Sequence, residues 1–157
     1  MNRDEFIQLL KEYKINQAKK DLNLLEKKRL LKEIEKLQDD YNVNITPTYQ
    51  EGSKGNQVTS KVENMVERKD SRINEKLARI EEIDKKNEEL DDRLNMVNIR
   101  LGSLNRLEKE IITDYYINEL DYKTIGIETY WRIINQTRSE DTVKRKIDKI
   151  MQKMLKL

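Results

Sequence analysis

The residues with the most recognisable chemistry lie in a short basic segment near the end of the chain. Ser139 is a residue type that caps helices, and a regular apolar stripe follows it: Val143, Ile147, Ile150, Met154 and Leu157. The steps of four, three, four and three predict a helix that buries one face. Such a helix presents Thr, Lys and Arg from its first turns and fits the DNA major groove, where these side chains hydrogen-bond to bases.

Candidate DNA contacts follow from position on this predicted helix. Lys144 and Arg145 are expected to donate to guanine, and Thr142 to touch a thymine methyl or a phosphate. Asp141 either accepts from a cytosine amine or only holds Arg145 in place. The remaining candidates are expected to contact the sugar-phosphate backbone: Arg138, Ser139, Lys146 and Lys149.

Charge is distributed unevenly along the chain. Residues 129–157 hold eight Lys or Arg and three Asp or Glu, a surplus of five positive charges, although the whole chain carries only +2. A phosphate-binding end would show this asymmetry. In the alternative interpretation, pairs four residues apart, such as Asp141 with Arg145, are ordinary surface ion pairs.

Two shorter helices are predicted ahead of the basic one. Asn105 and Glu108 have the spacing of a capping box, which opens a helix running to about residue 117. Its inner face would carry Leu107, Ile111 and Tyr115.

Asp121 is predicted to cap the second of these helices, which contains Tyr122 and Ile125. Gly126 follows the buried Ile125 and would let two helices cross closely, although a glycine that ends a helix is an equally common reason for it. The joint order predicts a three- or four-helix helix-turn-helix domain over residues 104–157, in preference to a generic bundle.

Two long helices must carry this domain. The first, from about Asp4 to Tyr41, contains no Gly or Pro and has an apolar stripe at roughly helical spacing: Phe6, Leu10, Tyr13, Ala18, Leu22, Leu25, Leu31, Ile34, Leu37 and Tyr41. A connector over residues 42–58, with Pro47, Gly52 and Gly55, breaks it.

The second long helix is predicted to open at Ser60, which has capping-box spacing to Glu63. Its seam has steps of three or four: Ile73, Leu77, Ile80, Ile83, Asn87, Leu90, Leu94, Val97, Leu101 and Leu104. Two consecutive steps of three, at Leu77, Ile80 and Ile83, resemble a coiled-coil stammer.

The expected fold is all-α, with a long N-terminal antiparallel coiled-coil hairpin over residues 1–103. Similar helix lengths and a modest connector favour pairing within one chain. The alternative is that the second helix also pairs with its copy in another chain. Asn87 either fixes the register of the seam or is a neutral residue at a partly wet position.

Composition argues against an enzyme. The chain has no Cys and no His, so thiolate chemistry, disulfides and the commonest general base and metal ligand are excluded. We expect no catalytic residues, metal or cofactor. No apolar run approaches the roughly 20 residues of a membrane span, and residues 1–6 show no signal-peptide pattern, so we expect a cytoplasmic protein without membrane contact.

Three motifs resemble region 4 of the sigma-70 family: the run 107–112, Tyr122-x-x-Ile125-Gly126 and Ser139-x-x-Thr142-Val143-x-Arg145. The whole layout resembles the phage transcriptional regulators of the RinA/ArpU type, with an N-terminal coiled coil, a connector containing Gly, Pro and Tyr, and a C-terminal domain like sigma region 4. The resemblance implies sequence-specific binding to promoter DNA and control of phage or mobile-element genes, with RNA polymerase as a further partner.

One stretch departs from the family pattern. About six residues usually separate the Ile from the capping Ser, whereas residues 126–138 put thirteen between Ile125 and Ser139. We expect a longer second helix or an elaborated turn there. Trp131, the only Trp, is expected to pack in the core, with a contact to a base or sugar as the less favoured alternative.

The predicted function is therefore that of a DNA-binding transcriptional regulator. We expect an activator and not a complete sigma factor, because the chain has no aromatic-rich segment for promoter melting. The long helices would form a homo-oligomer or contact polymerase. Two rivals stay open. One is a coiled-coil interaction or scaffold protein without DNA binding; the other is a DNA-packaging protein like a terminase small subunit, in which the DNA-binding part usually comes first.

Overall fold

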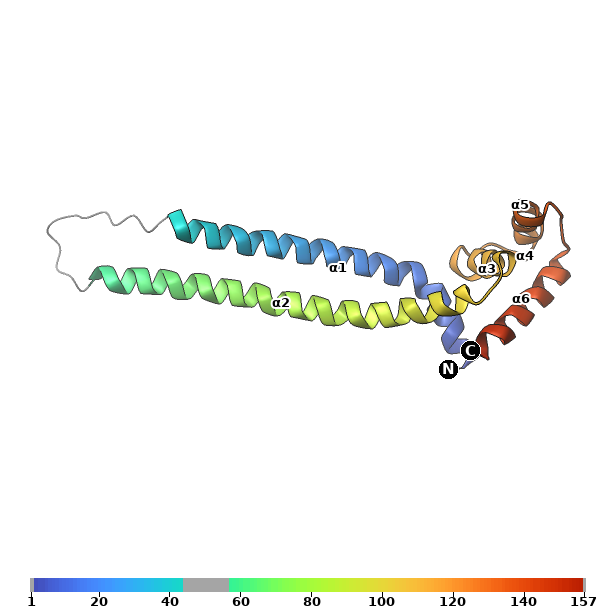
Figure 1. Cartoon of the computed structure of the whole chain (residues 1–157), viewed down its shortest axis with the longest axis horizontal. Helices are drawn as coiled ribbons and strands as arrows, with labels where there is room; N and C mark the ends of the chain where they lie inside the picture. The colour runs from blue at the N-terminus through green and yellow to red at the C-terminus, as the bar shows by residue number, and fades with distance from the viewer. Residues whose placement is uncertain (1, 44–56, 157) are drawn as a thin grey trace. The chain divides into compact units, whose positions relative to one another are not determined.

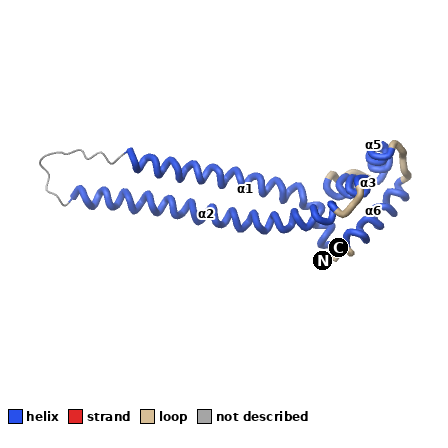
Figure 2. The backbone as a smooth tube through the Cα atoms, in the orientation of Figure 1, coloured by secondary structure: helices blue, strands red, loops and turns tan. Residues whose placement is uncertain are grey.

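The computed structural model describes the backbone of residues 2–43 and 57–156 and the side chains of residues 2–39 and 65–156. Within these ranges all regular secondary structure is helical, short loops join the helices, and there is no strand (Figures 1 and 2). This confirms the predicted all-α fold with a long N-terminal helix pair and a small helical C-terminal region. The elements are α1 (Arg3–Val43), α2 (Gln57–Gly102), α3 (Arg106–Ile112), a π-helical turn η1 (Thr113–Ile117), α4 (Tyr122–Thr124), a second π-helical turn η2 (Ile125–Thr129), α5 (Tyr130–Ile134) and α6 (Glu140–Leu155).

The two long helices begin in different ways. Asn2 and Glu5 form a reciprocal capping pair at the start of α1, with the Glu5 amide 2.8 Å from the Asn2 side-chain oxygen. Helix α2 begins at Gln57, so Ser60 lies inside the helix and the predicted cap there is wrong. The central part of the predicted connector, residues 44–56, lies outside the described residues.

Residues Lys20–Glu88 form one compact unit, in which α1 and α2 run antiparallel. Hydrogen bonds join Asn23 to Asn87 and Lys27 to Asp84, and further along the pair Lys76 reaches Glu33. Because the residue numbers on α2 fall as those on α1 rise, the two helices form an antiparallel hairpin. Figure 1 shows them side by side, α1 in blue and α2 in green.

The seam of α2 follows the prediction at nearly every position. Ile80, Ile83 and Asn87 are buried, but Leu77 is 44% exposed. Lys76 is the half-buried residue at this point, with its ammonium 2.5 Å from Glu33. Replacing Leu77 by Lys76 restores regular steps of three and four, so the predicted stammer is absent.

The seam of α1 was predicted wrongly in its middle part. Ala18, Leu22, Leu25 and Leu31 are exposed. The residues on the inner face recur every three or four positions and include polar ones: Asn16, Lys20, Asn23, Lys27, Leu30, Ile34 and Leu37. The apolar pattern alone missed this seam because the seam contains polar residues, of which Asn23 and Lys27 bind Asn87 and Asp84 of α2.

The second compact unit combines Met1–Lys19 with Glu89–Leu157. One apolar core contains Phe6 and Leu10 of α1, Val97 and Leu101 of α2, and residues of α3 through α6. The ends of the long helices are therefore part of the core that holds the C-terminal helices, and this unit does not follow the expected boundary between residues 103 and 104. Among the described residues, no helix combines the length and apolar content needed to cross a membrane.

Candidate nucleic-acid interface

The first helix of the C-terminal region begins as predicted. The Asn105 side chain accepts from the Glu108 amide at 2.9 Å, and the Glu108 carboxylate accepts from the Asn105 amide at 3.4 Å. The helix continues from α3 through η1 to Ile117. The capping box and the helix end at Ile117 are both confirmed.

The second helix is longer than in the family pattern. Asp121 accepts from the Thr124 amide at 2.7 Å, which confirms the predicted cap, and this hydrogen bond holds the pKa of Asp121 below its usual value. The helix then runs without interruption through α4, η2 and α5 and ends at Asn135, whose φ of 55° is left-handed. Most of the insertion over residues 126–138 is therefore a lengthened second helix, one of the two predicted forms.

Gly126 lies in the middle of this helix, where the chain leading into α6 crosses it. The Arg138 amide donates to the Gly126 carbonyl at 2.9 Å. A Cβ at position 126 would overlap the Arg138 carbonyl oxygen and lie 3.4 Å from a methyl of Val143. The close-crossing role of Gly126 is confirmed, and the alternative that it ends a helix is wrong.

Helix α6 buries the predicted stripe. Val143, Ile147, Ile150 and Met154 are buried, and Met151, which the sequence pattern missed, joins them. Leu157 lies outside the described residues. Ser139 occupies the N-cap position, but its side chain does not cap; its hydroxyl is 3.0 Å from that of Thr142.

The exposed face of α6 carries most of the predicted DNA contacts. Asp141, Thr142, Lys144, Arg145 and Lys149 are all exposed. With about 100° per residue, Arg145 lies directly opposite the buried stripe. Thr142 and Lys149 lie to one side of Arg145, and Lys144 lies to its other side, between the exposed face and the stripe.

The cations of this face are not used in ion pairs within the described part of the chain. Lys144, Arg145 and Lys149 have no hydrogen bond or ion pair to any described residue. Asp148, four residues after Lys144, binds Arg3 at 2.6 Å instead of Lys144. The alternative in which Asp141 pairs with Arg145 is likewise not observed, so these cations remain available to an anionic ligand.

Lys146 does not belong to this exposed face. Its ammonium lies 3.0 Å from the Glu108 carboxylate, and Lys153, two turns further along α6, lies 3.0 Å from the other oxygen of the same group. The two lysines join α6 to α3. The sequence places Lys146 among basic residues, but only the fold shows that it points toward another helix.

Glu108 is thus a buried carboxylate with donors from two helices. Burial raises the pKa of its carboxyl, but the hydrogen bonds from Lys153 and Lys146, together with the Asn105 amide, outweigh burial and hold the pKa below its usual value. The sequence pattern indicated only a capping role for Glu108. Its contact with α6 spans about forty residues of sequence, so no local pattern could reveal it.

A second buried carboxylate, Asp114, joins the first helix to the second. It accepts from the Thr129 hydroxyl at 2.7 Å and from the Arg132 guanidinium at 2.8 Å. Asn118 donates to its other oxygen at 2.7 Å. Asp114 therefore aligns the two helices that precede α6, a role that the sequence did not indicate.

The expected core position of Trp131 is wrong. Its side chain is 57% exposed, and Ile127 and Ile134, four residues before and three after it, are also exposed. The π-helical turn over Ile125–Thr129 changes the helical phase, so that Ile125 and Tyr130 face the core and Trp131 faces solvent.

A shallow groove beside the N-terminus of α6 brings together residues of the second and third helices: Lys123, Ile127, Arg138, Ser139, Glu140 and Asp141. Of the predicted backbone-contacting residues, Arg138 and Ser139 lie in this groove. The Arg138 guanidinium is hydrogen-bonded to the Gln136 side chain. The groove therefore has cations and carboxylates on its walls, whereas the exposed face of α6 beyond Asp141 is basic.

Comparisons with family descriptions, with curated proteins and with solved structures each find no match for this chain.

Proposed function

We propose that the protein is a sequence-specific DNA-binding regulator of transcription, acting on phage or mobile-element genes and most simply as an activator. The observation that carries the proposal is the exposed face of α6, where Lys144, Arg145 and Lys149 lack partners among the described residues. A capped first helix, a crossing second helix and a third helix with one buried face support the helix-turn-helix interpretation.

In this mechanism α6 enters the major groove with Arg145 at the centre of the contact. Arg145 donates to the acceptor edge of a guanine, and Thr142 contacts a neighbouring thymine methyl or phosphate. Lys149 and Arg138 neutralise phosphates on the flanking backbone. Lys146 stays on Glu108, so its contribution is to hold the helix rather than to bind phosphate.

The proposed partners are double-stranded promoter DNA and RNA polymerase, which places the protein in the cytoplasm. The long helix pair would supply self-association or the contact with polymerase. A C-terminal region that binds DNA and a helix pair that binds protein are the two parts that an activator needs.

The test is binding of the full chain to fragments of the DNA upstream of its own gene, measured by fluorescence anisotropy at low and moderate salt. Arg145→Ala should lose about 1–3 kcal/mol, or roughly fivefold to 150-fold in affinity. Arg106→Ala is the matched control, because Arg106 is an exposed arginine on α3 without a partner among the described residues.

Circular dichroism should show unchanged helix content in both variants. Failure of the wild-type protein to bind any fragment would refute the regulator hypothesis. Equal affinity of Arg145→Ala and wild type would refute α6 as the base-reading helix, even if DNA binding itself were retained.

A coiled-coil interaction protein without DNA binding is the second candidate. The observation that favours it is the group of exposed leucines on the hairpin formed by Lys20–Glu88. Absence of DNA binding together with stable protein association would support this candidate.

A further inference from the structure

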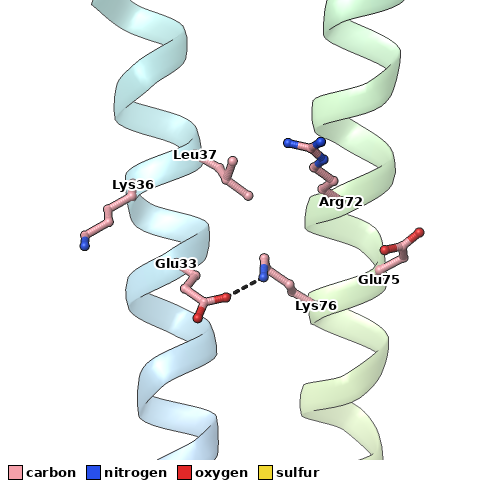
Figure 3. A pocket seen from close by; sticks show the side chains of 6 residues that line it. All are labelled: Glu33, Lys36, Leu37, Arg72, Glu75 and Lys76. Carbon is pink, nitrogen blue, oxygen red and sulfur yellow. Dashed lines mark hydrogen bonds and ion pairs between the residues drawn. The ribbon is translucent and has the colours of Figure 1, made fainter.

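The two sides of the hairpin differ in chemistry. On one side, ion pairs close the boundary between the helices: Arg79 binds Glu26 at 3.1 Å and Glu82 at 2.9 Å. Further along the same side, Lys76 binds Glu33, as Figure 3 shows for the two helices and their neighbouring side chains. This side is not free of apolar side chains, since Leu22, four residues before Glu26 on the same face of α1, is 65% exposed.

The other side carries leucines. Lys27 and Asp84 join the two helices there at 2.5 Å. Leu24 and Leu31, three residues before and four after Lys27, share its face of α1, and they are 47% and 48% exposed. Leu77, two turns before Asp84, shares the face of α2 that Lys27 reaches. We call Leu24, Leu31 and Leu77 the leucine side of the hairpin.

The back of α1 is apolar too. Leu22 and Leu25 are 65% and 64% exposed, while Leu30 of the same stretch is buried against α2. Between residues 22 and 31 the helix therefore carries leucine on almost every face. These leucines alternate with polar and charged residues, and the partner helix covers only the seam, so the leucines outside the seam stay exposed unless a further helix covers them.

We propose that the leucine side of the hairpin binds the leucine side of a second copy of this chain, so that two hairpins form a four-helix bundle. The inference rests on the hairpin alone and is independent of the proposed DNA contacts.

The charge balance of the hairpin favours a second copy as the occupant over a strongly charged partner. The described side chains of this unit, residues 20–39 and 65–88, include thirteen Lys or Arg and twelve Asp or Glu, a net charge of +1, so two copies meet with little net repulsion. Both signs border the leucine side, with Lys28 and Glu35 on α1 and Glu81 and Lys85 on α2. Such a border can pair with itself, whereas a net charge of only +1 gives nucleic acid or an anionic membrane little attraction to this unit.

The first experiment measures the mass of the full chain by light scattering across a range of concentrations. The wild-type protein should be a dimer that dissociates on dilution. Leu24→Glu/Leu31→Glu should weaken the dimer at least tenfold, because it places four carboxylates in the contact. Ile99→Glu is the matched control, since Ile99 is 72% exposed and lies outside this unit, and it should leave the mass unchanged.

A milder variant distinguishes weaker association from unfolding. Leu24→Ala/Leu31→Ala should keep the helical circular-dichroism signal and still shift the protein toward monomer. A monomeric wild-type protein at every concentration would overturn the proposal. A dimer that both double variants preserve would also overturn it, because association would then occur elsewhere.

The second experiment uses the absence of cysteine from the chain. Leu31→Cys should form a disulfide-linked dimer under mild oxidation. Glu82→Cys, on the side with the ion pairs, is the control and should remain mostly uncrosslinked. Equal crosslinking of the two variants, or faster crosslinking of Glu82→Cys, would contradict the proposed face.

Discussion

Glu108 and Asp114 show how single residues organise the C-terminal helices. Each is a carboxylate buried among apolar residues, and each binds donors from another helix: Glu108 binds Lys146 and Lys153, and Asp114 binds Thr129 and Arg132. A buried charge is costly unless it is fully paired. These two carboxylates therefore select the one arrangement of the helices that supplies their partners.

Glu108 should make the stability of the protein depend on acid pH. Because its folded-state pKa is lowered, its contribution to stability is present above the usual glutamate pKa of about 4.3 and is lost as pH falls through the lower folded value. Glu108→Gln should lower the melting temperature near neutral pH and flatten its fall below pH 5. Thermal unfolding followed at several pH values measures both effects.

The exposed Glu128 supplies the control. Glu128→Gln should leave the acid dependence of the melting temperature as it is in the wild-type protein. An unchanged acid profile in Glu108→Gln would mean that other carboxylates cause the loss of stability.

Gly126 should tolerate no larger side chain. Gly126→Ala places a methyl group against the backbone carbonyl of Arg138, so we expect a loss of about 1–3 kcal/mol in the free energy of unfolding. Gly102→Ala, whose Cβ would meet nothing within 4 Å, should be neutral or stabilising by up to about 1 kcal/mol. Urea unfolding of both variants compares them directly, and equal stability would contradict the close crossing.

At the scale of elements, the hairpin is an unusually polar coiled coil. Asn23 donates to Asn87 at 2.9 Å across the seam, and Lys27 reaches Asp84. Polar pairs at such positions cost stability but favour the one register in which they meet. These polar pairs explain why α1 and α2 adopt this register although many leucines of α1 lie outside the seam.

The pair of asparagines should behave as a coupled unit. Asn23→Leu/Asn87→Leu should raise the melting temperature, because leucine replaces amides in the seam. Asn87→Leu alone should gain much less, since it leaves the Asn23 amide without its partner. A double-mutant cycle should give a coupling of about 0.5–3 kcal/mol; additive effects would show that the hydrogen bond does not matter.

At the scale of the whole molecule, the two ends of the long helices and the C-terminal helices are folded as one compact unit. Phe6 and Leu10 are completely buried, and Val97 and Leu101 are almost so, in the core that also contains Val143 and Ile150. The segment that carries the proposed DNA-binding helix therefore obtains part of its core from residues about one hundred positions away.

A fragment of residues 104–157 should consequently fail to fold alone. In the fragment, the apolar side chains that pack against Phe6, Leu10, Val97 and Leu101 become exposed. A domain of this size buries too little apolar surface to remain stable after that loss. We expect low helix content and no cooperative thermal transition by circular dichroism. A cooperative transition in the fragment would show that α3–α6 form an independent core.

The sequence by itself determined the features that depend on near neighbours. These are the helical class, the capping box at Asn105, the cap at Asp121, the buried stripe of α6 and most of the seam of α2, because each follows from contacts within a few turns or from regular apolar spacing. Several errors come from the apolar pattern. Apolar spacing placed Leu22 and Leu25 in the seam, and Trp131 was expected in the core because it is large and apolar, while the structure exposes all three.

Only the tertiary structure decided which polar residues are satisfied by distant partners. Lys76 enters the seam because Glu33 is opposite it, Lys146 turns away from the exposed face because Glu108 binds it, and Gly126 must be small because Arg138 crosses there. Each of these partners is between 12 and 43 residues away in the sequence. The energy of a paired charge or a close crossing depends on what lies on the other element, and a local pattern cannot contain that information.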